Sequence, residues 1–451
     1  MHTRCRVTGR LRGPRGRRVV SAPTRHACRA ALLWCFAAGF SHESAALGAD
    51  ALNSSEKPKI VGTPDEGPHN EFNLLPVAGG TTDIGIGGGY FAGLAHVEEG
   101  FDPYLWNIES AGLVTFKLLP GEKIVLPYQD DYVQFTVPRL FGIPLRLEIR
   151  AEYSWETTLG YYGLGNAAPP PTVAASKYNE YGRLHPEVLI DARWRVVDHL
   201  AAIAGVGFSQ SWQQIAQTSK LASDLQTGSP EVKHLLGSVN TAGVATAIGG
   251  LQWDTRDNEV STHSGSYDTV NLKISPGGLE ALPYRYAEMT AIMRVFVPIW
   301  GSHLTLAMRL AGDVLVGQPP FYELSRFVDT YSTYALGGQN GVRGVPAQRY
   351  YGKIKVLGNA ELRSELASFR ALGKPMIFGI VGFADAGRVW ADTSFHPELD
   401  GTGIGLKYGV GGGLRLQSGS SFVLRADVAW SPDARALGSP VGGYFAAGQM
   451  F

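Results

Sequence analysis

The sequence predicts an all-β protein, a transmembrane antiparallel up-and-down β-barrel, and three observations support this fold class. Apolar and polar residues alternate with a period of two over long segments, as expected for strands with one wet and one dry face. Glycine accounts for 57 of 451 residues and only 18 % are charged, whereas ordinary soluble domains have about 7 % glycine and about 25 % charged residues. No helical heptad pattern appears after about residue 75, so one uniform domain is expected there.

The strongest alternation covers residues 143–156, IPLRLEIRAEYSWE. This segment is longer than a typical soluble strand and fits a tilted strand that crosses a bilayer. Fifteen segments share the pattern: 82–95, 106–118, 128–138, 143–156, 179–195, 198–214, 240–256, 266–275, 284–297, 302–314, 351–366, 374–391, 405–417, 420–430 and 442–451. Because such barrels generally have an even number of strands, we expect sixteen, with the missed strand before residue 250. The alternative is a secreted β-sandwich or propeller, but no propeller repeat of ~40–50 residues is visible.

The first 48 residues are predicted to be a signal peptide. Residues 1–29 contain nine arginines and no acidic residue, an apolar stretch follows at 30–40, and small residues occupy much of 44–48. This order is typical of a cleaved export signal, and the apolar stretch is too short to span a bilayer. The alternative, a basic nucleic-acid-binding arm, would not continue into an apolar run.

Removal of residues 1–48 changes the charge and the cysteine content. The whole chain has 40 basic and 40 acidic residues, whereas residues 49–451 have 31 and 39, a net charge of −8. All three cysteines lie in the predicted signal, so no disulfide or thiolate metal site is expected in the mature chain. Residues 49–75 are polar and rich in Pro, Gly and Asn, which predicts a flexible lead-in, and 76–451 are predicted to form the barrel.

Five motifs follow one another in a characteristic order. They are YYGLGN at 161–166, DTRDN at 254–258, a long loop at 321–352 with VRGV at 342–345, GNAELR at 358–363 and FADAG at 383–387. Together they resemble the BamA/TamA-type bacterial surface antigen superfamily of outer-membrane barrels. This resemblance implies that the long loop folds back into the barrel and presents a V-R-G-aromatic tip.

The resemblance also implies an anchor for this loop. Arg343 and Gly344 would form the tip, with Asp385 as the main partner of the arginine and Glu361 as an auxiliary acceptor. An arginine held by carboxylates in a confined polar lumen makes charge-assisted, bidentate hydrogen bonds. The alternative is a solvated Arg343 and an ordinary turn acid at Asp385. Val345 replaces the usual aromatic residue of the tip, so weaker apolar packing is expected beneath the loop.

Two further features match the family. Asp254, Arg256 and Asp257 form the barrel motif DTRDN; its acids could suggest a calcium loop, but the EF-hand spacing is wrong and a turn at a strand end is the preferred interpretation. Phe451 at the end of the sequence resembles the assembly signal of outer-membrane barrels, a final strand with a terminal aromatic residue. Gln449 is a departure from that pattern.

No enzymatic activity, cofactor or metal is predicted, because G-x-S-x-G, H-E-x-x-H and His pairs at metal-binding spacing are absent after residue 48. The predicted lead-in is too short for the periplasmic POTRA domains that family members carry, so a barrel-only member is expected.

Two functions remain open. The favoured one is insertion or assembly of membrane proteins, or protein translocation, through a weak glycine-rich seam between first and last strands at 85–93 and 442–448. The alternative is a structural or plugged-channel barrel without a client protein. The expected location is the bacterial outer membrane. The expected partners are its lipids, client outer-membrane or secreted proteins and a separate periplasmic partner, with no nucleic acid.

Overall fold

The structure, a computed structural model, describes residues 67–451 except for 99–100, 102–103, 119–123, 171–175, 238, 240, 329–331, 372–373, 419–421 and 434–439. The predicted signal peptide and the predicted lead-in up to residue 66 lie outside the described residues.

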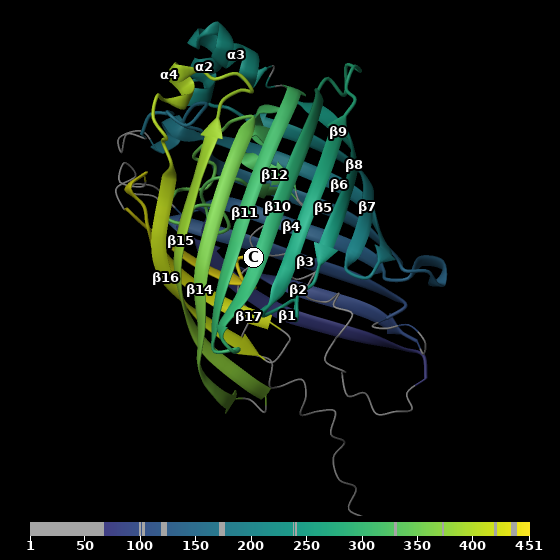
Figure 1. Ribbon diagram of the computed structural model, residues 1–451. Helices are drawn as coiled ribbons and strands as arrows, with labels where there is room; N and C mark the ends of the chain where they lie inside the picture. Colours follow the sequence, from purple (N-terminus) through teal and green to yellow (C-terminus); the bar gives the residue numbers. More distant parts are fainter. Residues whose placement is uncertain are drawn as a thin grey trace, which may run out of the picture. The chain divides into compact units, whose positions relative to one another are not determined.

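Sixteen strands of the described chain close into an antiparallel barrel, in which each strand pairs with the next barrel strand along the sequence (Figure 1). The strands are β1 (His69–Thr81), β2 (Gly85–Val97), β3 (Trp106–Leu118), β4 (Ile124–Val137), β5 (Leu145–Gly160), β6 (Glu180–Val197), β7 (Leu200–Gln214), β8 (Ala242–Asp254), β9 (Gly265–Ser275), β10 (Arg285–Trp300), β11 (Leu304–Gln318), β14 (Ile354–Ala371), β15 (Lys374–Trp390), β16 (Lys407–Ser418), β17 (Phe422–Trp430) and β18 (Val441–Ala447). The predicted fold class and strand number are therefore confirmed.

The strand that the sequence pattern missed is β1, which precedes residue 250 as expected. It begins at His69, so residues 69–75, predicted as the end of the flexible lead-in, belong to the barrel, and the predicted barrel start at residue 76 is wrong. Asn73, Pro76 and the glycines at 79 and 80 interrupt its apolar alternation. Pro is tolerated here because β1 is a seam strand with a largely unpaired edge, where a missing N–H costs little.

The wall separates a polar lumen from an apolar outer face, as the period-two pattern predicts. On β5 the side chains of Glu148, Arg150 and Glu156 are buried inside, while Ile149 and Tyr153 between them are exposed on the outside. Charged residues can alternate with apolar ones at low cost, because the charged side chains face the polar lumen and the apolar side chains face lipid.

The connection between β11 and β14 lies inside the barrel. It contains a 3₁₀ turn, η3 (Phe321–Ser325), and a small hairpin of β12 (Arg326–Val328) and β13 (Ser332–Tyr334). Its later part forms one apolar cluster with wall residues; the members are Ile292, Ala311, Phe327, Ala335, Leu336, Val342, Val345, Tyr350, Leu357 and Val389. The predicted infolded loop is thus present.

A second apolar cluster forms a lid at one end of the barrel. The helices α2 (Lys220–Thr227), α3 (Pro230–Leu236) and α4 (Pro397–Asp400) lie at this end (Figure 1). Buried side chains of α2 and α3 pack with Tyr161 and Leu164 of the YYGLGN motif and with Phe321 and Tyr322 of η3. Two further 3₁₀ turns are η1 (Leu140–Gly142) and η2 (Ser176–Asn179). In the part of the chain that the structure covers, no helix is long and apolar enough to cross a membrane.

Candidate functional site: the loop anchor and the seam

The tip of the infolded loop is bound by Asp385 on β15. The backbone N–H of Arg343 donates to Oδ2 of Asp385 at 3.1 Å, while Nε donates to Oδ2 at 2.8 Å and Nη2 to Oδ1 at 2.9 Å. Nη1 of Arg343 donates to Oε1 of Glu361 on β14 at 2.6 Å. All three side chains are fully buried. The structure brings the predicted tip residue and both of its predicted partners together, in bidentate geometry at Asp385.

Three contacts of the tip were not predicted. Asp427 on β17 accepts from Nη1 of Arg343 at 3.3 Å, and the guanidinium lies 3.4 Å from the centre of the Phe383 ring. The N–H of Gly344 donates to the hydroxyl of Tyr444 on β18 at 2.8 Å. Sequence alternation places Asp427 on a polar strand face, but it does not reveal which strands meet at the loop tip.

Weaker apolar packing was expected beneath the tip, because Val345 replaces the usual aromatic residue. The aromatic ring comes from Phe383 of the wall, while Val345 is completely buried in the loop cluster.

Two glycines allow the loop backbone to approach the wall. Gly344 has φ +90°, and a Cβ there would lie 3.0 Å from the backbone nitrogen of Ser431. A Cβ at Gly409 on β16 would lie 1.9 Å from the carbonyl oxygen of Arg343. Larger residues at either position would push the tip away from β16 and β17.

The anchor is a balanced group of buried charges. Arg363 donates from Nε to Oε2 of Glu361 at 2.8 Å, and Arg415 lies within 2.5 Å of Asp427 and 3.6 Å of Glu361. Burial alone would lower the pKa of Arg343, but the carboxylates of Glu361 and Asp385 outweigh it and raise the pKa above its usual value. The tip is therefore held as a cation, and removal of one member would leave buried charge without compensation.

A second anchor, which the sequence did not indicate, binds the start of the loop. Oε2 of Glu323 in η3 accepts from Nζ of Lys273 on β9 at 2.8 Å, and Arg326 lies 3.8 Å from Oε1. Lys273 also pairs with Glu288 on β10 at 2.7 Å. Burial by itself would raise the pKa of Glu323, but Lys273 and Arg326 together lower it to about 2.

This second anchor predicts an acid-dependent loss of stability. The pKa of Glu323 is lower in the folded protein than the ordinary value of 4.5, so its stabilisation is complete above that value and is lost as the pH falls towards about 2. We expect Glu323→Gln to lower the free energy of unfolding by about 3 kcal/mol at pH 7. The difference between the two proteins in urea unfolding should shrink between pH 5 and pH 2. A constant difference over that range would contradict the assignment.

The DTRDN residues stabilise the turn between β8 and β9 and do not contact the loop tip in the hydrogen bonds of the described residues. Asp254 accepts from Nε and Nη2 of Arg256 at 3.0 and 2.7 Å, and the guanidinium lies 4.0 Å from the centre of the Tyr267 ring. Oδ1 of Asp257 accepts from the N–H groups of His263 and Ser264. These contacts fit the interpretation of the motif as a turn at a strand end.

The seam between the first and last strands is short. In the described chain β1 pairs with β18 at only two positions, Gly80 with Phe445 and Thr81 with Tyr444, whereas β1 pairs with β2 at thirteen. One further bond runs from the N–H of Thr82 to the carbonyl of Gly443 at 3.1 Å. The prediction that 85–93 forms one side of the seam is wrong. That segment is β2, whereas the strand that pairs with β18 is the missed strand β1, which precedes β2 in the sequence.

The infolded loop contacts both sides of this seam. Gly344 donates its N–H to the hydroxyl of Tyr444 on β18, as described above, and the backbone N–H of Ala347 faces the carboxylate of Asp83 in the turn between β1 and β2. The loop position and the seam are therefore physically connected.

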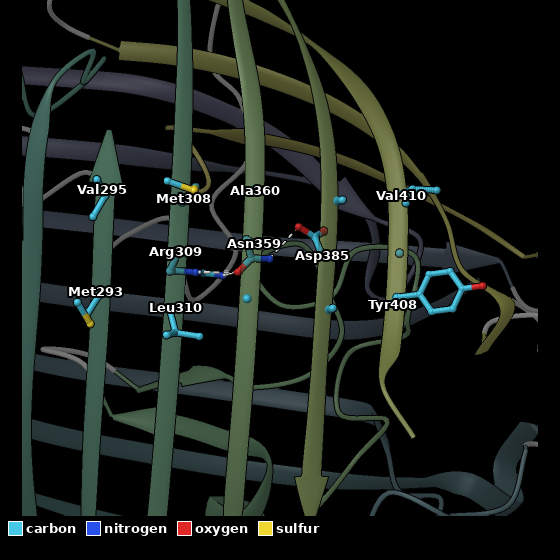
Figure 2. A pocket seen from close by; sticks show the side chains of 14 residues that line it. Met293, Val295, Met308, Arg309, Leu310, Asn359, Ala360, Asp385, Tyr408 and Val410 are labelled. Carbon is cyan, nitrogen blue, oxygen red and sulfur yellow. Dashed lines mark hydrogen bonds between the residues drawn. The ribbon is translucent and has the colours of Figure 1, made fainter. Parts of the chain in front are cut away.

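On the outer wall, β10, β11 and β14–β16 line a pocket of about 600 Å³ (Figure 2). Gly358, Ala360, Ala384 and Ala386 leave space between larger residues on both sides, which are Met293, Val295, Met308, Leu310, Tyr408 and Val410. Figure 2 also shows Asn359 between Arg309 and Asp385; it accepts from Nε of Arg309 at 3.0 Å and donates to Oδ1 of Asp385 at 2.8 Å. The same strands therefore have the pocket on their outer side and the Asn359 and Asp385 side chains, which contact the loop, on their inner side.

Comparisons with known proteins agree with this architecture. The model of the "Omp85 superfamily domain" matches residues 132–451. The fold is similar to BamA from Haemophilus ducreyi lacking POTRA domains 1–3, with a TM-score of 0.56 and 14 % identity over 90 % of this chain and 77 % of that one. It is also similar to CdiB from Escherichia coli, with a TM-score of 0.53 and 10 % identity over 86 % of this chain and 64 % of that one. A search of curated protein sequences gave no match.

Proposed function

Because the chain belongs to the Omp85 superfamily, as its BamA/TamA-type motifs predicted, we propose that it inserts or translocates other proteins through the seam between β1 and β18. The observation that carries this proposal is the two-pair seam. Every other junction of the barrel has at least seven pairs, so the wall is weakest here by a wide margin.

The seam leaves a strand edge without a partner in the described chain. Residues 70–79 of β1 pair with β2 on one side but not with β18 on the other. An exposed edge presents backbone N–H and C=O groups to an incoming strand, which is how strands are added to a sheet. Phe72 and Leu74 on this part of β1 are 67 % and 60 % exposed, so an added strand would meet an apolar, lipid-facing surface.

The proposal is tested by reconstitution. The protein in lipid vesicles is mixed with a urea-unfolded outer-membrane barrel protein, the client, and insertion of the client is followed by protease protection. We expect the protein to accelerate insertion relative to empty vesicles and to vesicles with an unrelated sixteen-stranded porin. Equal rates in all three would contradict an insertase role.

A plugged channel is the second candidate, because the buried loop and its two anchors occupy the lumen. Single-channel recording in planar bilayers separates the two functions. We expect Arg343→Ala to leave steady conductance unchanged, since the Glu323 anchor and the lid still hold the loop. If the tip alone blocks a channel, the variant will conduct steadily.

The remaining parts of the proposal follow from the family. We place the protein in the bacterial outer membrane, in contact with its lipids, after cleavage of residues 1–48 as a signal peptide. Its other partners would be unfolded client proteins and a separate periplasmic protein. Nothing in the site calls for catalysis, because its charged groups are buried in mutual contacts that hold the loop.

A further inference from the structure

Four small residues form a continuous patch on the outer face of the wall. Gly358 pairs with Ala386 and Ala360 pairs with Ala384, so two successive pairs of small residues join β14 to β15. Asn359, between the two residues of β14, points into the lumen and donates to the loop. Because side chains alternate between the faces of a strand, the four small residues face outward. No side chain longer than a methyl group stands on this part of the wall.

Larger side chains stand on both sides of the patch. The ladder register continues each small pair into β11 and β16, so that two rows of four residues run across the wall, each with a large residue at both ends. The rows are Met308, Ala360, Ala384 and Val410, and Leu310, Gly358, Ala386 and Tyr408. They line the pocket of about 600 Å³ on the outer wall, which we call the wall groove (Figure 2). Since neighbouring strands lie about 4.8 Å apart, the floor is about as wide as one hydrocarbon chain.

Packing within the chain does not explain the small size of the floor. The nearest atoms to a Cβ at Gly358 would lie 4.0 Å away, and a Cβ at Gly382, which also faces outward on β15, would have none within 4 Å. At Gly409, by contrast, a Cβ would clash with the loop, as described above. A glycine weakens a strand, because it loses more backbone entropy on folding and packs no side chain. The space above Gly358 is therefore open to a molecule outside the chain.

The chemistry of the wall groove favours an apolar occupant. Three of its lining residues are charged or amides, but Arg309, Asn359 and Asp385 direct these side chains into the lumen, where they bond one another. The remaining lining side chains are apolar apart from the hydroxyl of Tyr408. The groove is also continuous with the exposed apolar face around Leu362, which faces the hydrocarbon of a bilayer. An occupant rich in polar groups would have to bury them without partners.

We propose that the wall groove is a binding site for one acyl chain of a membrane lipid. The chain lies over the four small residues, between the large side chains of β11 and those of β16. Met293 and Met308 on the β10–β11 side are partly exposed, and their flexible thioether chains adapt to its shape. The bound chain covers the outer face of the strands that hold the loop tip on their inner face. This site goes beyond the proposed insertion function and does not rest on it.

Photo-labelling from the lipid tests the site in the unmodified protein. The protein is reconstituted in vesicles of phosphatidylethanolamine and phosphatidylglycerol that contain a small fraction of phosphatidylethanolamine with a diazirine in the middle of one acyl chain. After irradiation, labelled peptides are identified by mass spectrometry. We expect about fivefold more label on the wall groove than on the outer face of β4 and β5, because a chain in the groove contacts protein on three sides. Val133, Ile149 and Tyr153 are exposed on that reference face.

Filling the groove should remove this difference. Ala360→Leu together with Ala384→Leu places two larger side chains on the floor, where they point towards lipid and are tolerated by an outer wall. We expect labelling of the groove to fall about fivefold, to the level of the reference face. The matched control is Ala192→Leu with Ala204→Leu, which alters a direct outward pair of β6 and β7 in the same way. It should leave labelling of the groove within about twofold of the parent.

Two results would overturn the proposal. Equal labelling of the groove and the reference face in the parent protein would show that the groove meets only freely exchanging lipid. Full labelling of the groove in the filled variant would show that the four small residues do not form the site. The first comparison uses no variant, so a folding defect cannot imitate it. Because no client protein is present in either measurement, failure of the insertase function would leave both results unchanged.

Discussion

Replacement of Arg343 by alanine is expected to lower the free energy of unfolding by about 3 to 5 kcal/mol, since it leaves buried carboxylates without their partner. Asp385 loses two charge-assisted hydrogen bonds from the side chain, and Glu361 loses one. The ring of Phe383 loses the cation above it. The change should appear in urea unfolding of the reconstituted barrel and as faster proteolysis of residues 335–345.

Arg370→Ala is the control, because Arg370 lies on β14 like Glu361 but is exposed. Its effect should stay within about 0.5 kcal/mol. The reversed pair Arg343→Glu with Asp385→Arg should recover part of the stability that Arg343→Glu alone removes. If Arg343→Ala behaves like Arg370→Ala, the arginine is not an anchor.

A disulfide across the seam is expected to abolish client insertion. A Cβ at Gly443 would lie 3.8 Å from Cγ2 of Thr82, so Thr82→Cys with Gly443→Cys brings two thiols within reach of a disulfide. The oxidised protein, with its native cysteines replaced by serine, should remain folded and bind vesicles but fail to accelerate insertion. Dithiothreitol should restore the rate.

The matched control places the same cross-link in an ordinary part of the wall. Ala92 on β2 and Ser110 on β3 are direct partners in the ladder, and a disulfide between Ala92→Cys and Ser110→Cys should leave insertion unchanged. Full activity of the oxidised seam variant would show that β1 and β18 need not separate.

The strands were largely predictable because a lumen and a lipid phase on opposite sides impose a period of two. β1 escaped prediction because Asn73, Pro76 and two glycines break the pattern, and a seam strand is under less constraint to keep it. Without β1, the sequence pattern places the seam at β2, whereas β18 pairs with β1. Only the ladder register identifies the true edge.

The loop anchor was predictable only in part. Arg343, Asp385 and Glu361 stand in motifs whose order suggested their meeting, and the structure brings them together. Asp427 and Tyr444 join them because closure of the barrel brings β17 and β18 to the same point of the lumen, and no local pattern encodes closure. The end of β18 at Ala447, followed by a turn at Gly448, was not predictable either. A glycine after an apolar strand is compatible with many conformations.

The most direct test of the central claim is a photo-cross-link from the free edge of β1. p-Benzoylphenylalanine is placed at Leu74, and in a second protein at Leu414 on β16, both of which are exposed on the outer wall. Each protein is then reconstituted with a client barrel whose insertion is arrested by a folded domain at its N-terminus. We predict that the client is captured at Leu74, through one of its terminal strands, and not at Leu414. Capture at neither position, or equally at both, would contradict a seam that admits client strands.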